Sequence, residues 1–165
     1  MKRFAFLLSV AAVATACNND VTGLGPPSNP ATETFNPSLG VDISQMTKMP
    51  NGVYYLDLIE GPLTADTVTA KTLSVKVNYA GYLKDGKLID SGSGATLELA
   101  VLIQGFKAGM MGMRAGGKRK IVIPSELGYD GDAIKNTDGT IKIPRQSTLI
   151  FDVDLLTVTD VSTTS

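Results

Sequence analysis

The sequence predicts an α+β domain in which a mainly antiparallel β-sheet surrounds one short helix. Apolar and polar residues alternate over 73–79, as they do in a strand with one buried face. The Asp85-Gly86 pair that follows favours a tight turn and predicts a hairpin. Over 103–113, in contrast, apolar residues recur every three or four positions, which is the period of a helix.

Three strands can be placed from composition and from the residues that end them. Strand-forming residues fill 53–59 and stop at Gly61-Pro62. A further strand is expected at 118–123, because Pro124 has no amide proton with which to continue the pairing. The strand over 73–79 has alternate residues on its buried face: Leu73, Val75, Val77 and Tyr79.

The predicted helix covers 104–113, and its apolar stripe consists of Ile103, Phe106, Met110 and Met113. Its glycines each cost about 1 kcal/mol relative to alanine, so the helix needs the sheet packed around it in order to form. The same glycines would let strands approach closely. The last strand presents alternate apolar residues to this core: Leu149, Phe151, Val153 and Leu155.

The composition excludes several classes of catalyst. The chain has 165 residues, no histidine and one cysteine, Cys17. It can therefore form neither a Ser-His-Asp nor a Cys-His catalytic group, and no intrachain disulfide. No calcium site is expected, because Asp130, Asp132 and Asp138 do not have the spacing of an EF-hand and are expected to be turn carboxylates.

The charge balance argues against nucleic acid as a partner. The chain has 15 Lys and Arg against 16 Asp and Glu. Without residues 1–16, which contain Lys2 and Arg3, 13 basic residues face 16 acidic ones and the formal net charge is −3. The three basic residues 118–120 are expected to be a solvated entry to their strand.

The N-terminus is expected to direct export. Residues 1–3 are basic at two positions and 4–16 are uncharged, too short a stretch to cross a bilayer, which takes about 20 residues. The sequence ATAC ending at Cys17 resembles a bacterial lipobox. We therefore expect a signal peptide at 1–16, lipidation of Cys17, and location in the bacterial cell envelope, facing the periplasm or the surface. A plain secretory signal with a free Cys17 thiol is the alternative.

The predicted organisation has three parts after the signal peptide. Residues 17–39 are the lipidated cysteine and a flexible tether rich in Pro, Asn, Thr, Ser and Gly. Residues 40–158 are the folded domain, in which 40–50 is included only loosely. Residues 159–165 are a C-terminal tail.

Four segments of the domain occur in a distinctive order. They are VKVNYAGYLKDGKLIDSG, VLIQGFKAGMMGMRAGGKRKIVIP, ELGY and IPRQSTLIFDVDLL. Their order and spacing resemble the FKBP-type peptidyl-prolyl cis-trans isomerases over about 51–158. The resemblance implies a curved antiparallel β-sheet wrapped around one short α-helix. It also implies an activity, rotation of Xaa-Pro bonds, that needs no nucleophile, metal or cofactor.

The resemblance assigns site residues position by position. Tyr79, Asp90 and Tyr129 match the catalytic positions, and Tyr129 is expected to donate its hydroxyl hydrogen to a carbonyl of the bound chain. A hydrophobic pocket for the prolyl ring is implied by the remaining matches: Ile89, Leu97, Leu102, Ile103, Phe106, Ile143 and Phe151. The pocket is less aromatic than the family pattern at Ile89, Leu97 and Phe106.

Two hypotheses on function follow. In the first, the protein is an isomerase that assists the folding of exported proteins by desolvating the proline amide and stabilising its twisted form, against a barrier near 20 kcal/mol. In the second, it is a lipid-anchored proline-binding chaperone module with little turnover. An unrelated structural β-domain would require the ordered match to be accidental. The expected partners are Xaa-Pro segments of unfolded exported proteins, a membrane and macrolide inhibitors.

Overall fold

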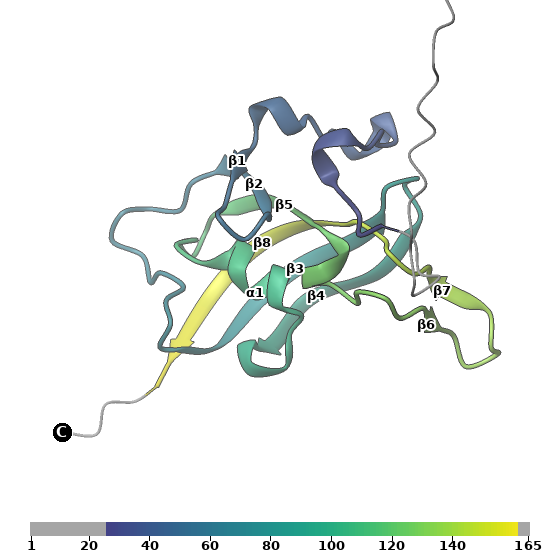
Figure 1. Cartoon of the computed structure of the whole chain (residues 1–165). Coiled ribbons are helices and arrows are strands. Elements are labelled where there is room, and N and C mark those ends of the chain that lie inside the picture. Colours follow the sequence, from purple (N-terminus) through teal and green to yellow (C-terminus); the bar gives the residue numbers. More distant parts are fainter. Residues whose placement is uncertain (1–25, 162–165) are drawn as a thin grey trace, which may run out of the picture.

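The computed structural model describes residues 26–161, and its main element is a six-stranded antiparallel sheet in the order β1-β2-β5-β8-β3-β4 (Figure 1). The strands are β1 (Thr47–Lys48), β2 (Tyr54–Ile59), β3 (Thr72–Leu83), β4 (Leu88–Glu98), β5 (Lys118–Ile123) and β8 (Leu149–Asp160). The strands β6 (Ile134–Lys135) and β7 (Ile141–Ile143) form a separate hairpin that projects from the body. The predicted signal peptide, Cys17 and residues 18–25 lie outside the described residues, as do 162–165.

The long strands β3 and β8 pair over their whole length and carry the centre of the core. Alternate side chains of β8 are buried on the inner face, from Leu149 to Leu155, as predicted. Val75 and Val77 of β3 are buried there too. The prediction was wrong for Leu73, which is 53% exposed. The pairing shifts register beside it, so Thr72 is buried in its place.

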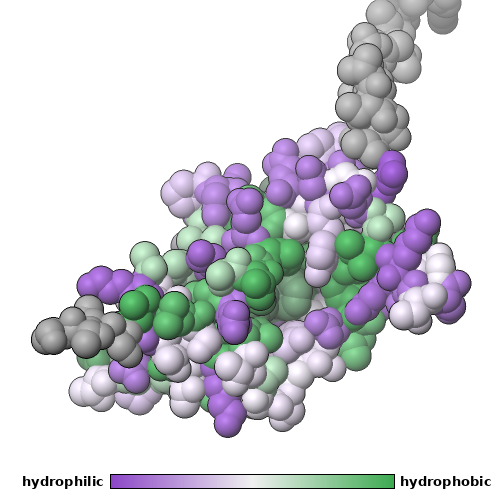
Figure 2. All heavy atoms as spheres, turned by 90° about the horizontal axis from the view of Figure 1, so that it is seen from below, coloured by the Kyte–Doolittle hydropathy of each residue, from purple (hydrophilic) through white to green (hydrophobic). Residues whose placement is uncertain are grey.

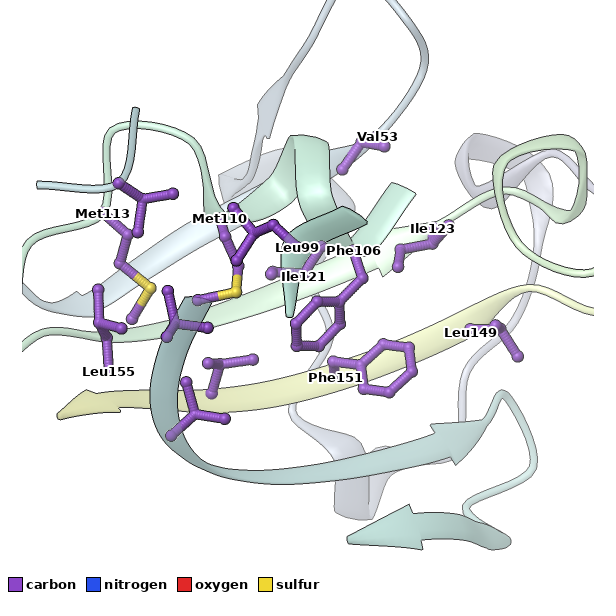
Figure 3. Packing of buried hydrophobic residues seen from close by; sticks show 14 of the residues in the cluster. Val53, Leu99, Phe106, Met110, Met113, Ile121, Ile123, Leu149, Phe151 and Leu155 are labelled. Atoms are coloured by element: carbon purple, nitrogen blue, oxygen red, sulfur yellow. The ribbon is translucent and has the colours of Figure 1, made fainter. Parts of the chain in front are cut away.

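The α-helix α1 (Gln104–Met110) lies across the inner face of the sheet and is shorter than predicted (Figure 3). It ends before Gly112, whose φ of +75° lies in the left-handed region and cannot continue a helix. A Cβ at Gly105 or Gly109 would collide with the methyl groups of Ile123 or Ile121 on β5. The prediction that these glycines allow close packing is confirmed.

The basic segment 118–120 is not the solvated strand entry that the sequence suggested. Arg119 and Lys120 are 5% and 6% exposed. The guanidinium of Arg119 donates to both carboxylate oxygens of Asp57, at 2.7 and 2.8 Å, and to the carbonyls of Gly109 and Met111 at the end of α1. Lys120 forms an ion pair with Asp152 of β8. These pairs let the charges be buried.

Residues 28–46, which we call the N-terminal strap, pack on the outer face of the sheet. Leu39 and Met46 are buried against outward-facing residues of three strands: Tyr54, Val122 and Ile150. The amide of Asn36 donates to the carbonyl of Lys84 at 2.8 Å. The structure therefore corrects the predicted tether, because 28–39 belong to the folded domain. The apolar residues responsible are too irregularly spaced to form a recognisable pattern.

The folded domain also ends later in the sequence than predicted. β8 continues to Asp160, and the amide of Val161 donates to the carbonyl of Lys71 at 3.0 Å. The predicted tail at 159–165 thus begins inside a strand. Within 26–161, no helix combines the length and the apolar character needed to cross a bilayer.

Candidate active site

A cavity of about 260 Å³ opens between α1, the inner face of the sheet and the segment that follows β5. This volume is close to the lower limit for small-molecule sites and suits a single side chain. Figure 2 shows one face of the molecule, with hydrophobic residues gathered at its centre and hydrophilic residues around them. The cavity is lined by Tyr79, Asp90, Leu97, Val101, Leu102, Ile103, Phe106, Tyr129 and Phe151.

Three aromatic rings form the inner wall of the cavity. Phe106 of α1 meets Phe151 of β8 edge to face, with centroids 4.9 Å apart and planes at 85° (Figure 3). Tyr79 of β3 meets Phe106 at 6.4 Å and 75°. Such pairs stabilise beyond the area they bury, by about 0.5–1.5 kcal/mol each. The wall is therefore apolar and well fixed.

Two glycines make room for these rings. A Cβ at Gly81 would lie 2.5 Å from Cε1 of Phe151, and a Cβ at Gly92 would lie 2.7 Å from Cε1 of Tyr79. Both glycines lie within strands, β3 and β4. A glycine inside a strand pattern is a known sign of close approach, and this was the signal in the sequence that the site prediction left unused.

The polar side of the cavity is formed by two phenols and one carboxylate. The Tyr79 hydroxyl donates to Oδ2 of Asp90 at 2.9 Å, while the Ser91 amide donates to Oδ1 at 3.0 Å. Burial is the largest cause of the raised pKa of Tyr79, and the hydrogen bond to Asp90 raises it further. Burial and the nearby charge of Asp90 raise the pKa of Tyr129 as well. Both hydroxyls are thus held as donors.

The structure brings all but two of the predicted site residues to this cavity. Ile89 is 6% exposed in the core, at a bulge where the pairing of β4 with β3 shifts between Asp90 and Leu88. The bulge turns Asp90 towards Tyr79 and leaves Ile89 packed behind it. Ile143 is 3% exposed and belongs to the same core. These two residues support the pocket without lining it.

One lining residue was not predicted. Val101 lies in a 3-10 turn (Leu99–Val101) just before α1 and is 78% exposed at the mouth of the cavity. Nothing in its own sequence context marks it, because an isolated valine beside Leu102 and Ile103 resembles core. Only the 3-10 turn brings Val101 to the cavity.

The flap between Tyr129 and Ile143 is an ordered hairpin. The Asn136 amide donates to the Thr140 carbonyl at 2.8 Å, and Gly139 turns with a φ of +84°. Asp138 accepts from the amide and the hydroxyl of Thr140, which lowers the pKa of Asp138. Among residues 26–161, no three His, Cys, Asp or Glu side chains are grouped as metal ligands would be.

A second cavity, of about 240 Å³, lies near the end of β2 and has a different character. Its charged groups are already paired, Arg119 with Asp57 and Arg114 with Glu60 at 3.6 Å. A polar cavity of this kind does not suit an apolar ring, so the cavity around Phe106 is the better candidate.

Comparison with protein families gives a match over residues 66–156 to the family described as FKBP-type peptidyl-prolyl cis-trans isomerase. An FK506-binding protein of Neisseria meningitidis serogroup B is 37% identical over 113 residues, covering 65% of this chain and 96% of that protein. The FKBP-type peptidyl-prolyl cis-trans isomerase FkpA of Escherichia coli K12 is 42% identical over 103 residues, covering 60% of this chain and 33% of FkpA.

Some relatives are much longer than the matched part. The match to peptidyl-prolyl cis-trans isomerase FKBP53 of Arabidopsis thaliana is 38% identical over 122 residues and covers 70% of this chain but 24% of that protein. The crystal structure of E. coli FkpA aligns with a TM-score of 0.60 at 33% identity, over 72% of this chain and 53% of FkpA. AtFKBP13 aligns with a TM-score of 0.60 at 29% identity, over 69% and 98%. The predicted fold is confirmed.

Proposed function

Because this chain belongs to the FKBP-type peptidyl-prolyl cis-trans isomerase family, through residues 66–156, we propose that it catalyses rotation of Xaa-Pro bonds in the cavity between α1 and the sheet. The observation that carries the proposal is the cavity itself. It combines an apolar wall of Phe106 and Phe151 with hydroxyl donors at its edge.

The apolar wall would act on the ground state of the substrate. A prolyl ring seated against Phe106, Phe151 and Ile103 would carry its amide out of water. Amide resonance places charge on the carbonyl oxygen, so removal from water weakens the resonance that resists rotation. The barrier near 20 kcal/mol would fall without any covalent step.

The Tyr129 hydroxyl would act on the twisted amide. Tyr129 stands at the mouth of the cavity, 38% exposed, where it can reach a carbonyl of the bound chain. Because its pKa is raised, it stays a neutral donor. Asp90 accepts from Tyr79 and would orient that phenol without exchanging protons. A site that fits the twisted amide better than the planar one accelerates exchange.

The test is NMR exchange spectroscopy or protease-coupled isomerisation of Xaa-Pro peptides with the purified full chain. Tyr129→Phe removes one hydrogen bond and is expected to lower kcat/KM about three- to tenfold, which corresponds to roughly 1 kcal/mol. Asp90→Ala is expected to lower it to a similar degree. Ser38→Ala, an exposed change on the strap, serves as the control.

The outcomes separate the two hypotheses. Acceleration that falls in both site variants supports the isomerase. Peptide binding without acceleration would instead favour the proline-binding chaperone module, consistent with Leu97 and Phe106 in the wall, two of the positions at which the pocket is less aromatic than the family pattern. Absence of both binding and acceleration would overturn the assignment of the pocket. The neisserial relative is named as an FK506-binding protein. Under the proposal, FK506 competes with the peptide for this pocket.

We further propose that the enzyme works in the bacterial cell envelope on exported proteins, where proline isomerisation is slow enough to limit folding. The support is the sequence 1–17, with its basic start, apolar stretch and ATAC ending. Mass spectrometry of the N-terminal peptide from membrane extracts tests this. A peptide that begins at Cys17 and carries acyl chains is expected, and an unmodified Met1 start would refute export.

A further inference from the structure

A buried polar junction joins the N-terminal strap to the base of the flap. Ser125, which is fully buried, exchanges two hydrogen bonds with Ser28 of the strap. The Ser125 amide donates to the Ser28 hydroxyl oxygen at 2.6 Å, and the Ser28 amide donates to the Ser125 hydroxyl oxygen at 2.9 Å. The Ser125 hydroxyl in turn donates to Oε1 of Gln146 at 2.8 Å. Three segments far apart in the sequence thus meet at Ser125.

The same serine holds the backbone on both sides of Tyr129. Its carbonyl accepts from the amide of Gly128 at 2.9 Å and from the amide of Asp130 at 2.8 Å. The backbone amide of Gln146 donates to the carbonyl of Asp130 at 3.2 Å. This bond connects the C-terminal end of the flap to the segment held by Ser125. The position of Tyr129 is therefore determined by the bonds of its two neighbours to this junction.

Two residues of the junction have a disfavoured backbone. Asp130 and Gln146 have φ values of +47° and +54°, in the left-handed region that residues with a Cβ avoid. Such conformations persist only where surrounding contacts hold them, and they are concentrated at functional sites. The bonds to Ser125 are contacts of this kind. Loss of one of them would allow the flap base to relax.

The strap holds Ser125 itself, through the two hydrogen bonds of Ser28. It is fixed to the sheet by Leu39 and Met46 in the outer apolar cluster and by the bond from the Asn36 amide to Lys84. Ser28 is thereby held against Ser125, a residue 97 positions later in the sequence. An element on the outer face of the sheet thus reaches the segment that carries Tyr129 on the inner side.

We propose that Ser28 is a positioning residue for catalysis, which acts through Ser125 to hold Tyr129 at the mouth of the pocket. This inference rests on the proposed role of Tyr129 in isomerisation. The flap of this isomerase is then set in part by one residue, Ser28, from outside the family match at 66–156.

The test is a double-mutant cycle on kcat/KM with the full chain. Ser28→Ala is expected to lower kcat/KM about three- to tenfold in the wild type. In a Tyr129→Phe background it is expected to have no further effect, because the hydroxyl it positions is absent. Ser28→Thr retains the hydroxyl and should restore most of the activity. Ser38→Ala, an equal change on an exposed strap residue, is the control.

A merely structural role gives a different result. If Ser28→Ala lowers kcat/KM equally in both backgrounds, or not at all, the proposal is overturned. If Tyr129→Phe itself leaves kcat/KM unchanged, the proposed function of Tyr129 fails, and the junction is then judged by NMR alone. In that case Ser28→Ala should still broaden or shift the ring signal of Tyr129 while Ser38→Ala does not, and an unchanged signal would also refute the positioning role.

Discussion

The hydroxyl groups of Tyr79 and Tyr129 lie in an environment that favours their neutral form. Burial is the main cause of the raised pKa of both side chains, and the negative charge of Asp90 adds to it. A phenol is a hydrogen-bond donor only while it keeps its proton. The site therefore keeps its donors through the whole neutral range.

This gives a prediction on pH. We expect kcat/KM to stay constant from about pH 6 to pH 9, and to fall only above pH 10, the ordinary pKa range of tyrosine. The chain has no histidine to add a step near pH 6.5. Peptide isomerisation across this range is the measurement, and an inflection near neutrality would contradict the assignment of the Tyr129 phenol as the donor to the substrate.

The same shifts have a consequence for folding stability. A tyrosine whose pKa is raised in the folded state keeps its proton when the unfolded chain loses it. Its contribution is complete below the pKa of the unfolded tyrosine and is lost as the pH rises above it. The midpoint of urea unfolding should therefore begin to fall near pH 10, more in the wild type than in a variant with Phe at both 79 and 129.

Gly81 should be as important for the pocket as the rings it accommodates. In Gly81→Ala the new methyl would press on the ring of Phe151, which lies 2.5 Å from the ideal Cβ position. We expect the ring to move into the pocket, the KM for proline peptides to rise several-fold and stability to fall by about 1–3 kcal/mol. Gly61→Ala, which overpacks against Arg114 at the other cavity, should lose stability without the change in KM.

At the scale of elements, the strap covers an outer sheet face that would otherwise expose apolar residues. Leu39→Ala removes a side chain that is 6% exposed, and should destabilise the fold by about 2–5 kcal/mol in urea unfolding. Leu63→Ala, at a site 83% exposed, should change stability by less than about 0.5 kcal/mol. Equal midpoints for the two variants would mean that the strap is a tether after all.

Elements marked by an apolar period or by the residue that ends them could be predicted from the sequence. The strand predicted at 118–123 has the same bounds as β5, and the helical stripe containing Phe106 and Met110 belongs to α1. The strap and the hairpin β6–β7 could not be predicted. The strap packs through isolated apolar residues without a period. The hairpin has only two and three residues in its strands, too few to show a period, although Ile143 is buried in the core.

Burial of charge was the other feature that local sequence could not supply. Arg119 is acceptable in the interior because Asp57 and the carbonyls at the end of α1 lie around it, and these groups come from distant segments. The candidate site was predicted better, since the family resemblance fixed its order along the chain. The cavity lining differs from the prediction at Ile89 and Ile143, which lie in the core, and at Val101, which a short turn brings to the pocket.

At the scale of the whole molecule, the strap shortens the link to any membrane anchor. If Cys17 is lipidated, the 11 peptide steps from Cys17 to Ser28 can span at most about 40 Å when fully extended. The tether predicted over 17–39 has about twice as many peptide steps, so its fully extended length would be about twice that of 17–28. The pocket would therefore work close to the membrane surface.

The folded domain should nevertheless function independently of any lipid on Cys17. The residues that line the pocket and those of the Ser28 junction all lie within 28–151. Cys17→Ser is therefore expected to move the protein from the membrane fraction to the soluble fraction of cells while kcat/KM on peptides stays within about twofold. Immunoblots of the two fractions, with peptide isomerisation by the purified protein, measure both. Loss of peptide activity in solution would show that the pocket depends on residues before the strap.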